Sequence, residues 1–259
     1  MNPTGASAPM EPDPPLGWRF QLRRIPFDEA GELLRASIAP YRAAPLRLLG
    51  MFLLLWFPIV LVAYLDAAGP LLAEIAAGIA FTGYTAALDA AIRSEVPEFK
   101  HLGVVLRFDR GKWVLLILSS VVPTLIAFLV LYGVWGYQAT SEFLKEWSKP
   151  GGQPIPVMAL DLRTADYIAG MPFTFVLPVW ALYRWSASRS MAANLLACLV
   201  NWRWVLAITG FQALGDTVLI WLRGQGEDMV LVSDIGVVAL QMLELSWTLA
   251  LAQRSFPSR

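Results

Sequence analysis

Residues 113–135 read WVLLILSSVVPTLIAFLVLYGVW, a run of 23 positions without a charged side chain. A helix of this length measures about 35 Å at 1.5 Å per residue, which is enough to cross roughly 30 Å of hydrocarbon. The run is apolar on every face, as in a membrane span or the core of a much larger protein. We therefore predict that it crosses a bilayer.

The rest of the chain extends this pattern. Of its 259 residues 57% are hydrophobic and 15% charged, whereas soluble domains carry about a quarter charged residues. Five further apolar segments accompany the first: 46–65, 70–92, 167–183, 202–222 and 229–252. These segments predict an all-α polytopic membrane helix bundle of about six transmembrane helices. The helices form three hairpins, with short interfacial helices on the cytoplasmic side.

The remaining stretches complete the domain plan. Residues 1–16 are rich in proline and small side chains, which predicts a disordered tail ahead of a single transmembrane domain over 17–259. Residues 136–166 are predicted to form the one long outer loop. This loop contains SEFLKEW as a short helix and then the helix-breaking run KPGGQPIP.

Basic residues are distributed unevenly between the two ends of these segments. Sixteen of the 20 Lys and Arg residues lie before the first span, after the second, after the fourth or after the sixth. The other four are Lys145, Lys149, Arg163 and Arg223. The positive-inside rule then predicts that both termini are cytoplasmic.

A weak threefold pattern lies on the same side. Residues 33–50, 99–116 and 194–209 each combine a short, partly apolar helix with a basic turn and the start of an odd-numbered span. The helix predicted over 27–41 has Phe27, Leu34, Ile38 and Tyr41 on one face, as in a helix lying on a membrane surface. This inner platform either anchors the bundle in the lipid bilayer or contacts another membrane protein or anionic lipid headgroups.

Ionisable residues within the spans are the candidates for function, since charge in hydrocarbon is expensive. Four carboxyls, with two glutamines on shared helical faces, make up this polar site: Glu74, Asp216, Asp234, Glu244, Gln212 and Gln241. The helical rise places Glu74, Asp216 and Asp234 roughly 6–9 Å below the outer boundary. They form either a cation or proton site open to the outer face, or groups that sit near the membrane interface or bond to neighbouring helices.

The sequence lacks the residues that several classes of function require. The net charge of zero argues against a nucleic-acid partner, since nucleic-acid binding needs a basic excess. One histidine and one cysteine do not supply a zinc site. No phosphate-binding, nucleophile-elbow or metalloprotease motif is present, so we predict neither a cofactor nor a metal and no enzymatic activity.

Residues 175–210 read FVLPVWALYRWSASRSMAANLLACLVNWRWVLAITG, with Ser190, Ala193, Ala197, Cys198 and Asn201 as their skeleton. This stretch resembles an uncharacterised family of small bacterial six-helix inner-membrane proteins. That family is similar to the membrane domain attached to some glycerophosphodiester phosphodiesterases. The resemblance implies a location in the bacterial inner membrane and transfers no catalytic residue. Asn201 is placed to cap the fifth span.

The sequence favours one function over another. The first interpretation is a non-enzymatic accessory or assembly component of the inner membrane. The alternative is a small transporter or permease subunit with carboxylates in the bundle interior, led by Asp216 and Glu244.

Overall fold

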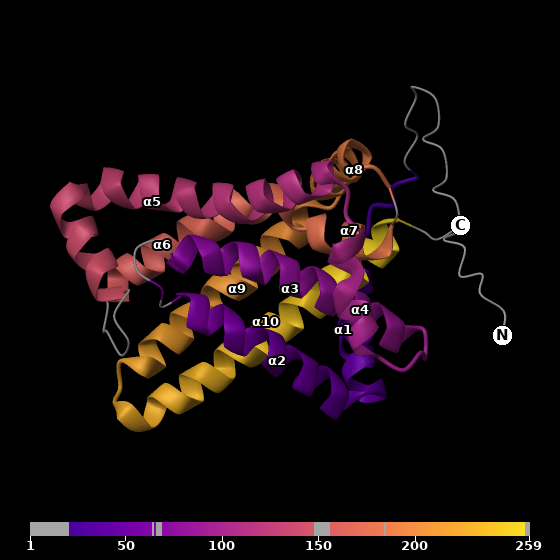
Figure 1. Ribbon diagram of the computed structural model, residues 1–259, viewed down its shortest axis with the longest axis horizontal. Helices are drawn as coiled ribbons and strands as arrows, with labels where there is room; N and C mark the ends of the chain where they lie inside the picture. The colour runs from indigo at the N-terminus through magenta and orange to yellow at the C-terminus, as the bar shows by residue number, and fades with distance from the viewer. Residues whose placement is uncertain (1–20, 64, 66–68, 148–155, 184, 257–259) are drawn as a thin grey trace.

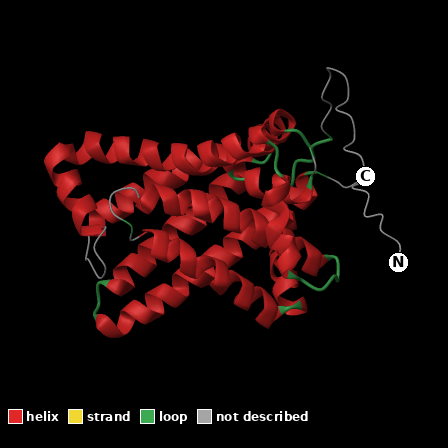
Figure 2. Cartoon of the chain, in the orientation of Figure 1, coloured by secondary structure: helices red, strands yellow, loops and turns green. Residues whose placement is uncertain are grey.

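A computed structural model shows the chain as helices and short connections (Figure 2). It describes residues 21–63, 65, 69–147, 156–183 and 185–256. This part of the chain contains no strand, so the predicted all-α fold is confirmed. The predicted tail over 1–16 lies outside the described residues.

Six helical stretches are long and apolar enough to cross a membrane, as predicted. Five of them are single helices: α2 (Pro45–Ala63), α3 (Gly69–Ile92), α5 (Arg110–Trp147), α9 (Trp202–Arg223) and α10 (Glu227–Ser255). The sixth, over residues 157–182, is made of α6 (Pro156–Gly170), the 3-10 turn η3 (Met171–Phe173) and α7 (Val176–Leu182).

Short helices precede the odd-numbered spans, which matches the predicted threefold layout. They are α1 (Ala30–Ala43) with the turn η1 (Phe27–Glu29), α4 (Phe99–Leu102) with the turn η2 (Gly103–Arg107), and α8 (Ala187–Val200). We call the end of the bundle where these helices lie the proximal end. The α9–α10 turn lies at the distal end (Figure 1).

Consecutive spans pack as three hairpins, α2 with α3, α5 with α6, and α9 with α10. Helix α3 is central, because it also contacts α5, α7 and α10. Half of its most apolar stretch is buried inside the protein, against 22–28% in the other five spans. The outward faces of those five spans remain apolar, as a lipid-facing surface requires.

The predicted loop over 136–166 is wrong. Helix α5 turns sharply at Gly136, whose φ of 78° suits glycine, and then continues helical to Trp147. Helix α6 already begins at Pro156, so the fourth span is ten residues longer at its start than predicted. The SEFLKEW stretch is helical, as expected.

Two asparagines, one on α8 and one directly after it, bind backbone groups where helices are interrupted. Asn194 accepts a 2.9 Å hydrogen bond from the Phe175 N–H and donates one of 2.6 Å to the Pro172 carbonyl. These bonds satisfy polar groups freed at the η3 break, which would otherwise be buried without partners.

Asn201 has a related role. It is the N-cap residue of α9, as predicted, but its side chain makes no capping hydrogen bond to that helix. Its side-chain oxygen accepts from the Ile25 N–H at 2.8 Å, while its nitrogen donates to the Arg23 carbonyl and to Ser255 Oγ. Trp204 Nε1 also donates to the Ile25 carbonyl at 2.9 Å. Segment 21–26 is thereby fixed between the start of α9 and the end of α10.

Helix α1 exists as predicted but does not lie alone on a surface. Leu33, Ser37 and Pro40 form its buried face, which packs against α10 and α3, while Leu34 is exposed. The Tyr41 hydroxyl donates to the Met242 carbonyl. The face predicted to lie on the membrane is thus not the one that packs on the bundle: Phe27 and Leu34 are exposed, whereas Tyr41 is half-buried.

Close packing of α3 against α4 depends on Gly83. A Cβ at this position would lie 2.5–3.0 Å from backbone atoms of Leu102, whereas a Cβ at Gly50 on α2 meets nothing within 4 Å. We expect Gly83→Ala to destabilise the fold by about 1–3 kcal/mol through overpacking. Gly50→Ala should leave the fold unchanged or slightly more stable. Thermal unfolding of both variants in detergent measures this, and equal midpoints would contradict it.

Candidate functional site

Side chains from α6 and α9 form a polar contact inside the bundle. The Tyr167 hydroxyl donates a 2.6 Å hydrogen bond to Asp216 Oδ2. The Arg163 Nε lies 4.0 Å from the same oxygen. One carboxylate of α9 thus faces both a cation and a hydroxyl donor of α6, four residues apart on one helical face.

Three further helices contribute to this site. Thr124 of α5 donates a 3.0 Å hydrogen bond to Asp166 Oδ1 of α6. Glu74 of α3 lies close enough to Arg163 and Asp166 to interact electrostatically with both. Glu244 of α10 has Gln212, Asp216, Glu74 and Asp166 as its electrostatic neighbours.

We call these residues the polar cluster: Glu74, Thr124, Arg163, Asp166, Tyr167, Gln212, Asp216 and Glu244. They come from five helices, of which α6 alone supplies three. The bundle therefore brings together groups that lie up to 170 residues apart in the chain.

The polar cluster lies within the spans. Asp216 and Arg163 are each seven residues from the distal ends of α9 and α6, which is about 10 Å at 1.5 Å per residue. The Asp216 side chain is 13% exposed and that of Arg163 is 40% exposed. Asp216 is therefore shielded by protein, whereas part of the Arg163 side chain reaches the surface of the bundle.

Charge in the polar cluster is unbalanced. It contains four carboxyls, Glu74, Asp166, Asp216 and Glu244, against the single guanidinium of Arg163. An uncompensated carboxylate in hydrocarbon is unfavourable by several kcal/mol, roughly. Bound protons or small cations are the chemical means of balancing the excess.

Four of the six predicted site residues belong to the cluster, namely Glu74, Gln212, Asp216 and Glu244. Asp234 does not, although it lies seven residues from the distal end of α10, as Asp216 does in α9. Its side chain is more than half exposed and pairs with the exposed Arg223 at 3.7 Å. Gln241 is half-buried on α10, and the structure shows no polar contact between it and the cluster in the described residues.

Three cluster residues, Arg163, Asp166 and Tyr167, were not predicted from the sequence. Arg163 and Asp166 fell in the predicted loop over 136–166, and Tyr167 was the first residue of the predicted fourth span. One signal was available. Residues 157–169 contain no proline or glycine, and Arg163, Asp166 and Tyr167 follow the i, i+3, i+4 spacing of one helical face.

Other chemical groups are separate from the cluster. Among the described residues no set of three or more His, Cys, Asp or Glu side chains is placed to hold a metal ion. The Cys198 thiol is buried beside the Met171 carbonyl, and burial raises its pKa to about 12. This thiol is uncharged near neutral pH and is a poor nucleophile.

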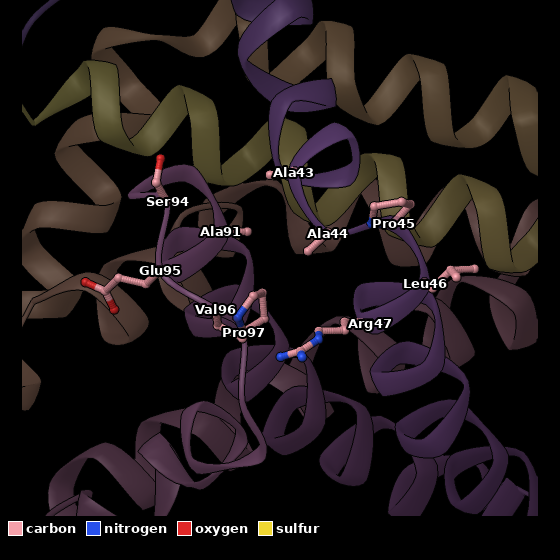
Figure 3. A pocket seen from close by; sticks show the side chains of 10 residues that line it. All are labelled: Ala43, Ala44, Pro45, Leu46, Arg47, Ala91, Ser94, Glu95, Val96 and Pro97. Carbon is pink, nitrogen blue, oxygen red and sulfur yellow. The ribbon is translucent and has the colours of Figure 1, made fainter.

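A pocket of about 530 Å³ lies at the proximal end, between the start of α2 and the loop that follows α3. Figure 3 shows the Arg47 guanidinium reaching toward Pro97, while the Glu95 carboxylate points away from the gap. Glu98 is an electrostatic neighbour of Arg47, which offsets the one positive charge of the lining. This pocket is remote from the polar cluster.

Comparisons with protein families, curated proteins and solved structures find no match to this chain. The polar cluster itself is therefore the basis for inferring a function.

The cation of the cluster can be compared with a matched exposed cation. We expect Arg163→Gln to lower the free energy of unfolding by about 2 kcal/mol or more, because it leaves four carboxyls without their guanidinium. Arg223→Gln removes the exposed ion pair with Asp234 and should change the free energy of unfolding by less than about 1 kcal/mol. Unfolding midpoints in detergent distinguish these outcomes, and similar losses for both variants would show that the cluster is not a special environment.

Proposed function

We propose that the chain is a small transporter or permease subunit that binds and releases a proton or a monovalent cation at the polar cluster. One observation carries this proposal. Four carboxyls and one guanidinium converge within the spans, and Asp216 is held between Arg163 and Tyr167. Intramembrane charges that face a bundle interior are the usual components of ion and proton pathways.

Asp216 is the central group in this proposal. Its Oδ2 accepts a hydrogen bond from Tyr167 and lies 4.0 Å from Arg163 Nε, so a proton or cation bound there competes with Arg163 for the same oxygen. Glu244 and Glu74 supply further carboxyls on either side of it along the membrane normal. Exchange between these groups needs no bond breaking other than proton transfer, so the proposed activity is not enzymatic.

The accessory or assembly role favoured by the sequence remains the alternative. It requires only that the polar cluster hold helices together, since buried ion pairs also fix helix register. The two roles predict different behaviour for a folded protein in which Asp216 has lost its charge.

The proposed location is the bacterial inner membrane, with the proximal end and both termini in the cytoplasm. Sixteen of the 20 basic residues lie on the side that contains the proximal helices, which supports this orientation. The distal ends of α6 and α9, near which Arg163 and Asp216 lie, then face the periplasm.

Labelling of introduced cysteines tests the orientation. Gln225→Cys in the α9–α10 turn and Glu95→Cys after α3 both place a thiol at an exposed position. We expect a membrane-impermeant maleimide to label Gln225→Cys in intact cells, and Glu95→Cys only after permeabilisation. Native Cys198, with a pKa raised to about 12 by burial, should stay unlabelled at pH 8 until the protein is unfolded. The reverse pattern for the two introduced thiols would overturn the orientation.

Ion flux tests the function. In proteoliposomes with a trapped pH dye, a potassium diffusion potential should drive proton entry faster than in protein-free vesicles. A parallel arm follows an imposed Na⁺ gradient with a sodium-sensitive dye. We expect Asp216→Asn to reduce the protein-dependent flux roughly tenfold or more, because the central exchangeable carboxyl is gone.

Asp234→Asn is the matched control, since it removes an exposed carboxylate of α10 outside the polar cluster and should leave the flux unchanged. Size-exclusion profiles and unfolding midpoints establish that both variants fold. Equal flux in the two variants, or no protein-dependent flux of either ion, would reject the transporter. A folding defect in Asp216→Asn with no flux in the wild type would favour the accessory role.

A further inference from the structure

We propose that the proximal end holds the phosphate group of an anionic phospholipid between Arg24 and Arg203. The site is a pocket of about 330 Å³ lined by Arg24, Ile25, Pro26, Phe27 and Arg203. It does not involve the polar cluster, and its test does not depend on ion transport.

The backbone that shapes this pocket is fixed by its neighbours. Ile25 is bound at its N–H by Asn201 and at its carbonyl by Trp204. Phe27 stacks on Trp204 with ring centroids 4.6 Å apart. Segment 24–27 is therefore held against the first turn of α9, and Arg24 and Arg203 line the same pocket from two separate elements.

Positive charge in the pocket has no local counter-charge. Within the described residues neither Arg24 nor Arg203 lies within ion-pair distance of a carboxylate. The nearest acidic side chains of this region are already engaged: Glu29 pairs with Arg23 and Arg254, and Glu32 with Arg254. Asp28 is exposed and does not line the pocket.

Two arginines that line one small pocket can supply the paired hydrogen bonds that a phosphate accepts. The larger proximal pocket lacks this feature, because its single cation Arg47 has Glu98 as a neighbour. The first turn of α9 adds its partial positive charge beside Arg203, so the helix dipole increases the local potential.

The surroundings indicate that the phosphate belongs to a lipid. Trp202, which starts α9, is 51% exposed at the level where aromatic side chains meet the membrane–water boundary. Arg203, Leu206, Gly210 and Leu214 share one outward helical face at spacings of three and four residues. Leu206 and Leu214 are exposed, and a Cβ at Gly210 would meet nothing within 4 Å. An acyl chain has an open apolar path directly below the arginine pair.

Native mass spectrometry of the full chain in detergent tests the site, with phosphatidylglycerol and phosphatidylcholine as probes. We expect retention of phosphatidylglycerol to fall about 25-fold in Arg24→Gln/Arg203→Gln, since each arginine near an anionic lipid contributes roughly fivefold. The phosphatidylcholine signal should change little. Arg35→Gln/Arg42→Gln removes the same charge from exposed positions of α1 outside the pocket and should keep wild-type retention.

Further arms make each outcome decisive. Inorganic phosphate at millimolar concentration should compete only weakly, because it lacks acyl chains. Binding of inorganic phosphate without retention of phosphatidylglycerol would show that the pocket takes free phosphate, and would overturn the lipid assignment. Equal losses of phosphatidylglycerol retention in the two double variants would show that the pocket is not the binding site. If the first double variant fails to fold, Arg203→Lys keeps the charge without the paired donors and should give intermediate retention, whereas wild-type retention would count against the site.

Discussion

A charged group in hydrocarbon must find its partners within the protein, and the position of Arg163 shows what this constraint does to the bundle. The guanidinium cannot be solvated by lipid, so carboxyls on α3, α6 and α9 lie near it. Those acids exceed the single cation and form hydrogen bonds of their own, to Tyr167 and Thr124. As a result α6 packs against both α5 and α9. One unfavourable charge thereby organises the contacts among helices that are far apart in the chain.

The same constraint applies to the backbone. The fourth span breaks at η3, and the chain enters the proximal end as the non-helical segment 21–26. Each interruption leaves peptide groups that no helix satisfies. Asn194 on α8 and Asn201 just after it provide the missing partners. Because a short side-chain amide can donate and accept at once, each asparagine replaces two backbone bonds. Helix α8 and the residue after it therefore hold the η3 break and segment 21–26 in place through these hydrogen bonds, in addition to connecting two spans.

Length and hydropathy predict five spans closely because each is an uninterrupted apolar run. The fourth is predicted to begin too late because Asp161, Arg163 and Asp166 interrupt the apolar pattern over its first ten residues. Two of these residues, Arg163 and Asp166, belong to the polar cluster. Asp216 and Glu244 could be predicted from the sequence, because each is an isolated acid inside a strongly apolar run whose boundaries are clear. Asp234 lies outside the cluster although it is as far from the distal end of its helix as Asp216, because its side chain is 55% exposed whereas that of Asp216 is 13% exposed. Which face of α10 turns outward depends on packing that the sequence alone does not show. The buried face of α1 depended on packing against α10, which no local pattern encodes.

Helix α9 connects the two ends of the molecule through a single rigid element. Its buried face includes Trp204, Ile208, Gln212 and Asp216, and its outward face begins at Arg203. Arg203 and Asp216 are 13 residues apart, which is about 20 Å along the axis. At the distal half, Gly215 and Gly236 each receive a leucine of the opposite helix, Leu240 and Leu219, so α9 and α10 interlock. A helix fixed by this interlock and by the contacts of Ile25 with Asn201 and Trp204 has little freedom to slide. Helix α6 packs against this fixed helix and is interrupted at η3, four residues after Tyr167. For the proposed ion exchange at Asp216, this break is the place near the polar cluster where the fourth span departs from regular helix.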